Sequence, residues 1–130
     1  TQLGPAAYVQ ASTVMLYPAA WVAKNNEALR QMESQQLAGF KPDIVLSRID
    51  ALLAFDRAAD LPGIKTPTLV IASEDDFVNP SYLSDELARL IPGSEAKFFS
   101  HGGHCFMQVG PREFNQAVMP FLEQHTPNRR

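Results

Sequence analysis

The sequence predicts an α/β fold in which a helical segment precedes two parallel strands and their helices. Residues 1–62 contain no stretch with the two-residue alternation of a half-buried strand, and their apolar residues recur at helical spacing. From Thr68 onward, short apolar runs alternate with helical patterns, which is the order of a strand–helix–strand crossover between parallel strands. Between the two parts, residues 60–67 contain two prolines and one glycine, which mark a connection.

The composition is that of one ordinary domain and excludes several classes of protein. The chain has 130 residues, 45% of them hydrophobic and 19% charged, which is enough to bury a core. A net charge of −3 argues against nucleic-acid binding, and the one basic cluster, Arg129-Arg130, is expected to be a solvated tail. No apolar run approaches the roughly 20 residues that span a bilayer. The single cysteine, Cys105, cannot form an internal disulfide; together with the lack of a leader pattern, this leads us to expect a cytoplasmic location.

The first half is expected to form a helical layer. Pro18 can occupy a first helical turn, where its missing N–H would have no partner anyway. Pro42-Asp43 suits a helix start, and an i, i+4, i+7, i+8 pattern of apolar residues follows it: Val45, Ile49, Leu52 and Leu53. The residues of this half show no catalytic motif.

The second half is expected to run strand, helix, strand, helix. Residues 68–73 are apolar and β-branched, which is typical of a strand buried on both faces, and residues 96–100 form a second short strand. Asn79 is the expected N-cap of the intervening helix, with Pro80 at its first position. Gly110-Pro111 opens the last helix, which Pro120 should kink or bring to the end of its regular part.

The chemistry is expected where the two strands end. The carboxyl ends of parallel strands face the ligand crevice of an open sheet. Glu74-Asp75-Asp76 follows the first strand, and the glycine-rich turn Gly102-Gly103-His104 follows the second. A carboxylate that accepts a hydrogen bond from a histidine ring holds one tautomer, so the other ring nitrogen can act as a general base toward a nucleophile.

These residues resemble the C-terminal end of an α/β-hydrolase. That family places its acid in a Gly-x-x-Asp-x-x-x-Pro pattern, and Ser73-x-x-Asp76-x-x-x-Pro80 matches it except that serine replaces glycine. The family's catalytic histidine follows one strand later, as His104 does, and its chain order is nucleophile, acid, histidine. The resemblance therefore implies catalytic roles for Asp76 and His104, with Asp76 rather than Asp75 as the acid.

The whole chain is also similar to the aminoacrylate hydrolase branch, which acts in pyrimidine degradation. Segments of the helical half carry this similarity: Leu3-Gly4-Pro5, Ala7-Tyr8-Val9-Gln10-Ala11 and Leu16-Tyr17-Pro18-Ala19-Ala20-Trp21. The resemblance implies that residues 1–62 form a helical cap (lid) segment. Residues 63–130 would then be the C-terminal βαβα part of the hydrolase core, with two parallel strands. Enol-lactone hydrolases share the late motifs and are the alternative within the superfamily.

One element of the family is missing from the chain. No Gly-x-Ser-x-Gly nucleophile elbow occurs, so the chain resembles a fragment that carries the triad acid and histidine but not the serine. We expect a serine-type hydrolase of a small polar metabolite, aminoacrylate or carbamate-like, that acts only with its upstream half. The chain alone should be inactive, and no cofactor or metal is implied.

A non-catalytic module is the competing function. Two buried-type strands make a poor sheet, because their edges stay unpaired. Strands from a missing N-terminal half, or self-association with strand exchange, would complete the sheet.

Several residues have alternative interpretations. Asp76 could simply be an acid at a helix start, and His104 a surface histidine, although their shared spacing favours catalysis. Glu74 and Asp75 are expected to be solvated loop acids. Tyr17 and Trp21 could line a substrate pocket, but core packing is equally expected. His101 and His104 could form a metal-binding pair, but the chain lacks the second ligand pair of a structural zinc site. Cys105 is better explained as a small thiol in the core than as a nucleophile. No role is expected for His125.

Overall fold

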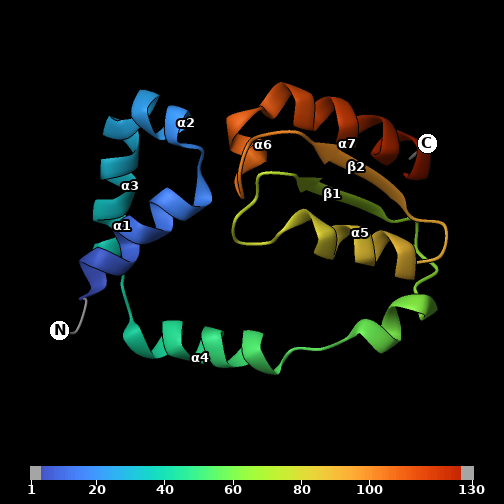
Figure 1. Ribbon diagram of the computed structural model, residues 1–130, viewed down its shortest axis with the longest axis horizontal. Coiled ribbons are helices and arrows are strands. Elements are labelled where there is room, and N and C mark those ends of the chain that lie inside the picture. Colours follow the sequence, from blue (N-terminus) through green and yellow to red (C-terminus); the bar gives the residue numbers. More distant parts are fainter. Residues whose placement is uncertain (1–3, 127–130) are drawn as a thin grey trace. The chain divides into compact units, whose positions relative to one another are not determined.

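A computed structural model describes residues 4–126 (Figure 1). The chain divides between Arg57 and Ala58 into two compact units, and each unit is described by itself. Leu3 and the Arg129-Arg130 pair, which entered the sequence predictions, lie outside the described residues.

The first unit is entirely helical in its described part, as the sequence predicts. Its helices are α1 (Pro5–Leu16), α2 (Ala19–Lys24), α3 (Asn26–Ala38) and α4 (Pro42–Ala54). Pro42 occupies the first turn of α4 as expected, whereas Pro18 precedes α2 as its N-cap instead of lying inside the first turn. Helices α1, α2 and α3 pack together, and their most buried residues are Val9, Thr13, Tyr17 and Leu29.

Helix α4 has the predicted apolar pattern, but that pattern is largely exposed. Ile49, Leu52 and Leu53 are all exposed, the last of them by 81%. The periodicity therefore identified the helix correctly without indicating what covers its apolar side chains.

The second unit contains the two predicted strands and the helices that pack on them. Its elements are the short 3-10 helix η1 (Ala58–Gly63), β1 (Leu69–Ser73), α5 (Ser81–Leu90), β2 (Glu95–Phe99), α6 (Phe106–Val109) and α7 (Pro111–His125). Strands β1 and β2 pair in parallel, in a register that sets Leu69 beside Glu95 and Ser73 beside Phe99. Helices α5 and α7 flank the two-stranded sheet (Figure 1).

One boundary of the second unit differs from the sequence predictions. Helix α5 begins at Ser81, one residue later than expected, because the backbone of Pro80 is not helical (ψ of 137°) and this residue is the N-cap. Helix α7 contains Pro120, as expected, and continues to His125.

Three aromatic rings anchor the segment that follows β2. Phe99 at the end of β2 contacts Phe106 of α6, with ring centroids 5.5 Å apart, and Phe106 contacts Phe114 of α7 at 5.8 Å. Between Phe99 and Phe106 the chain turns through Gly102 and Gly103, which have φ of 138° and 65°. Both glycines are buried, and residues with a side chain rarely adopt such backbone angles.

Replacing Gly102 by alanine should destabilise the chain. A Cβ at this position would lie 2.6 Å from the Cβ of Phe106, on top of the strain of a positive φ. We expect Gly102→Ala to lower the free energy of unfolding by about 1–3 kcal/mol or more, measured by urea denaturation. Gly63→Ala is the matched control, because no atom lies within 4 Å of its Cβ, and its effect should stay within about 0.5 kcal/mol. Equal effects of the two substitutions would contradict this description of the turn.

Candidate active site

The parallel pairing brings the ends of the two strands together. Ser73 is the last residue of β1 and lies beside Phe99, the last residue of β2. The pairing extends one step further, because the N–H of Glu74 donates to the carbonyl of Phe99 at 2.8 Å. The acidic segment after β1 and the glycine turn after β2 therefore leave the sheet at the same edge.

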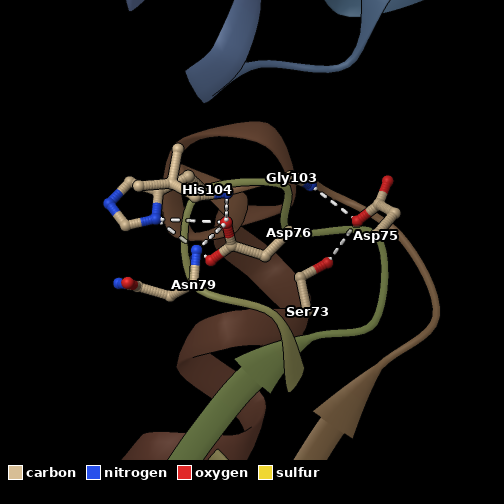
Figure 2. Close-up of polar contacts among 7 residues, drawn as sticks. Ser73, Asp75, Asp76, Asn79, Gly103 and His104 are labelled. Atoms are coloured by element: carbon tan, nitrogen blue, oxygen red, sulfur yellow. Dashed lines mark hydrogen bonds and ion pairs between the residues drawn. The ribbon is translucent and has the colours of Figure 1, made fainter. Parts of the chain in front are cut away.

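Asp76 and His104, predicted from the sequence to be neighbours, are in contact. The Nδ1 atom of His104 lies 3.0 Å from Oδ2 and 3.3 Å from Oδ1 of Asp76 (Figure 2). The Asp76 side chain is only 7% exposed, whereas the His104 side chain is 32% exposed. The carboxylate is thus largely buried behind a ring that still reaches solvent.

The Asp76 carboxylate is fixed by the backbone that follows it. Its Oδ1 accepts hydrogen bonds from the N–H groups of Val78 at 2.8 Å and Asn79 at 2.9 Å. These bonds leave Oδ2 facing the imidazole. A carboxylate held in this way favours the tautomer with the proton on Nδ1, so that the lone pair of Nε2 is available to take a proton. No described residue forms a hydrogen bond with Nε2.

Asp75 is an exposed loop residue, as expected, but its carboxylate also makes contacts that the sequence analysis did not predict. Its Oδ1 accepts hydrogen bonds from the hydroxyl of Ser73 and from the N–H of Gly103 at 2.8 Å (Figure 2). Its Oδ2 accepts one from the N–H of Gly102 at 3.2 Å. The glycine pair was a signal in the sequence, because a turn that presents successive backbone N–H groups can bind an anion. Glu74 is also exposed, as expected.

The electrostatics of Asp75 follow from these contacts. Partial burial raises the pKa of its carboxyl, but the hydrogen bonds from Ser73, Gly103 and Gly102 favour the ionised form and outweigh it. The net result is a pKa below the usual value of 3.8. Asp75 is therefore ionised over the physiological range.

Ser73 stands where the family pattern has glycine, and its side chain makes a hydrogen bond within the site. The residue is fully buried, with 0% exposure, and its hydroxyl donates to Asp75. The departure from the family pattern thus adds a contact to the site.

Tyr17 and Trp21, the candidate substrate-binding residues, stack on each other within the first unit. Their ring centroids are 4.6 Å apart with an angle of 10° between the planes, and Tyr17 is only 6% exposed. This geometry is what core packing would produce. Their role in binding a substrate stays a prediction.

The remaining histidines and the cysteine have separate environments. Nδ1 of His101 lies 3.0 Å from the hydroxyl of Ser100, and Cys105 is a half-buried free thiol. His125 lies against the ring of Phe121, and its Nε2 is 3.8 Å from Glu95. Within residues 4–126, no three His, Cys, Asp or Glu side chains gather as metal ligands would.

Curated relatives at more than 40% identity match almost the whole chain. A protein of Stutzerimonas stutzeri named "Putative carbamate hydrolase RutD" is 43% identical over 122 residues, which are 93% of this chain and 46% of that protein. A Caulobacter vibrioides protein of the same name is 41% identical over 92% of this chain and 45% of its own length. The chain thus spans about half the length of these relatives. No protein-family model matches it.

Solved structures share the fold. An α/β-hydrolase enzyme from a deep-sea metagenome, MGS-M2, superposes with a TM-score of 0.78 at 25% identity, covering 95% of this chain and 46% of that enzyme. The enol-lactonase of Burkholderia xenovorans superposes with a TM-score of 0.75 at 22% identity, covering 90% of this chain and 44% of its own. Within the described part of the chain, no helix combines the length and apolar character that a membrane crossing requires.

The stability contributed by Asp75 should depend on pH. Because its pKa is lowered in the folded state, the contribution is present above the unfolded value near 3.8 and disappears as the pH falls through the folded pKa. We expect Asp75→Asn to lower the urea midpoint at pH 7, and this difference to shrink as the pH falls below 3.8 toward the folded pKa. Glu74→Gln should leave the midpoint unchanged over the same range. A difference between Asp75→Asn and the parent chain that stays constant however far the pH falls would contradict the assignment.

Both comparisons match this chain to part of a longer protein. The similarity runs through both units, and the superposed enzymes match this chain over less than half of their own length. This chain is homologous to the C-terminal portion of the RutD proteins and has the fold of that portion of an α/β-hydrolase.

Proposed function

We propose that this chain supplies the acid and the histidine of a serine-type hydrolase whose nucleophile lies in an upstream half. The observation that carries the proposal is the contact between Nδ1 of His104 and the Asp76 carboxylate. The carboxylate is buried and the ring is partly exposed, so Nε2 can meet a group from outside the described residues. The lengths of the RutD relatives support an upstream half, since this chain covers about half of them.

The proposed mechanism assigns one task to each residue. Nε2 of His104 takes the proton from the serine hydroxyl or from water as that oxygen attacks the substrate, and later returns it to the leaving group. Asp76 holds the ring with Nδ1–H toward itself and stabilises the imidazolium that forms. Asp76 is itself held by the N–H groups of Val78 and Asn79, so the ring meets a carboxylate that is already oriented.

The proposed substrate is a small polar metabolite with a carbamate-like or aminoacrylate-like centre. The name of the RutD relatives, carbamate hydrolase, supports this class, as do the motifs shared with the aminoacrylate hydrolase branch. Enol-lactone hydrolysis is the alternative, and a substrate panel decides between them. Residues 1–62 would act as the cap of this site, in the cytoplasmic location expected from the sequence.

The upstream half would pair with the free edge of β1. The Thr68 carbonyl and the Glu74 N–H face β2, so alternation along the strand turns the backbone groups of Leu69 and Ile71 toward the other edge. Within residues 4–126 no strand pairs there, although Val70 and Ala72 are buried. Without the upstream half, a second copy of this chain could occupy the same edge.

Activity should appear when an upstream half is supplied. We would fuse the half of the Stutzerimonas stutzeri relative that precedes the matched region to this chain, and assay p-nitrophenyl acetate, aminoacrylate, a carbamate and an enol-lactone. We expect the fusion to be active and the chain alone inactive. His104→Ala and Asp76→Asn should each lower kcat by about 10³-fold or more.

The control for these variants is Glu74→Gln, because this side chain is exposed and adjacent to the site. It should retain the activity of the fusion. Full activity of His104→Ala would overturn the proposal. If the fusion hydrolyses the enol-lactone in preference to the carbamate and aminoacrylate, the proposed hydrolase activity stands and the proposed substrate class is wrong.

The chain alone should self-associate through its incomplete sheet. Sedimentation velocity at increasing concentration should show dimers or larger species for the chain, and less association for the fusion, in which the β1 edge is covered. A monomer at every concentration, with no change on fusion, would contradict the pairing at this edge.

A further inference from the structure

We propose that Asp75 and Ser73 are positioning residues, which hold the Gly102–Gly103 turn so that the His104 ring faces Asp76. The inference rests on the proposed function for its catalytic consequence, but the geometry itself can be tested without activity. It assigns roles to two residues outside the acid and histidine pair.

The first step is the contact between the Asp75 carboxylate and the backbone that precedes His104. Both carboxylate oxygens are engaged, one by the N–H of Gly103 at 2.8 Å and the other by the N–H of Gly102 at 3.2 Å. Gly103 is covalently joined to His104, so these bonds fix the direction in which the chain enters His104. The segment that follows β1 thereby controls the segment that follows β2.

The second step is that the turn has little to replace this carboxylate. Gly102 and Gly103 are buried and have positive φ, and Gly102 approaches the Cβ of Phe106 closely. Removing the carboxylate leaves two buried N–H groups without a partner, which is costly in the folded state. The turn then relaxes, and the 3.0 Å contact between Nδ1 and Asp76 is the first to be lost, because His104 is the next residue.

The third step concerns Ser73, whose hydroxyl has a single acceptor. Ser73 is fully buried at the end of β1, and its hydroxyl donates to the same Asp75 oxygen that accepts from Gly103. The serine therefore selects the side-chain conformation in which Asp75 reaches the glycine turn. Figure 2 shows the Ser73–Asp75–Gly103 contacts beside the Asp76–His104 pair.

The first experiment measures the tautomer of His104 in the full 130-residue chain. With ¹⁵N-labelled histidine, the ring nitrogen shifts of the neutral form distinguish Nδ1–H from Nε2–H, and His101→Gln and His125→Gln assign the signals. We expect His104 to be an Nδ1–H tautomer in the parent chain and a mixture richer in Nε2–H in Asp75→Ala. Asp75→Asn, which keeps one acceptor oxygen, should lie between them.

Glu74→Ala is the matched control, because it removes a neighbouring carboxylate that makes no contact with the turn, and it should leave the tautomer unchanged. If Asp75→Ala does not fold, Asp75→Asn and Ser73→Gly carry the test. A folded Asp75 variant with the parent tautomer would overturn the inference, since a purely structural role would lower stability without changing the ring.

The second experiment measures kinetics in the fusion with the upstream half. Asp75→Ala should lower kcat on the order of 10²-fold with KM within about twofold, because the general base is misplaced while substrate binding is kept. Ser73→Gly should lower kcat less than Asp75→Ala does. In the double variant it should lower kcat little further, because Ser73 acts on the turn only through Asp75.

The two experiments separate this inference from the proposed function. An inactive parent fusion with a tautomer that still depends on Asp75 would overturn the hydrolase and support the positioning role. An active fusion in which Asp75→Ala retains both kcat and tautomer would overturn the positioning role and leave the hydrolase in place.

Discussion

The parallel pairing of β1 with β2 is the constraint on which the rest of the second unit depends. Parallel strands end at the same edge, so residues separated by 28 positions in the chain, Asp76 and His104, leave the sheet side by side. The hydrogen bond from Glu74 to Phe99 extends the pairing past the last strand residues. Without this register the two segments would not meet. Neither the Asp76–His104 contact nor the hydrogen bonds from Gly102 and Gly103 to Asp75 could then form.

Two adjacent carboxylates at this edge act on different partners. Asp76 turns inward to the imidazole and is held by the N–H groups of Val78 and Asn79. Asp75 turns to the backbone of Gly102 and Gly103. A carboxylate offers a limited number of lone pairs, and each of these residues uses both oxygens, so neither can take over the contacts of the other. Burial raises the pKa of Asp75, but the hydrogen bonds from Ser73, Gly103 and Gly102 outweigh it and keep the pKa below its usual value, which maintains the charge that the turn needs.

The incomplete sheet is the feature that would make the proposed hydrolase depend on an upstream half. β1 has the apolar composition and burial of an interior strand, yet within residues 4–126 it pairs on one side only. Its relatives are about twice as long, and the superposed enzymes match over less than half of their length. In the proposed hydrolase the same upstream half would cover the open edge and supply the serine, so folding and catalysis would be completed by one association.

The sequence by itself predicted the helical first half and the strand–helix–strand–helix order of the second, because periodicity and prolines are local signals. The expectation that Asp76 and His104 are neighbours came from the shared edge of parallel strands and from the motif spacing. It located β1 and β2 to within one residue and missed the start of α5 by one residue, because the backbone conformation of Pro80 decides that boundary. It also did not indicate what covers the exposed apolar side chains of α4. Only the tertiary structure decided the contacts of Asp75 and Ser73. Asp75 accepts from two backbone N–H groups 27 and 28 residues away, and Ser73 donates to the Asp75 carboxylate, and neither partner can be read from the identity of the residue.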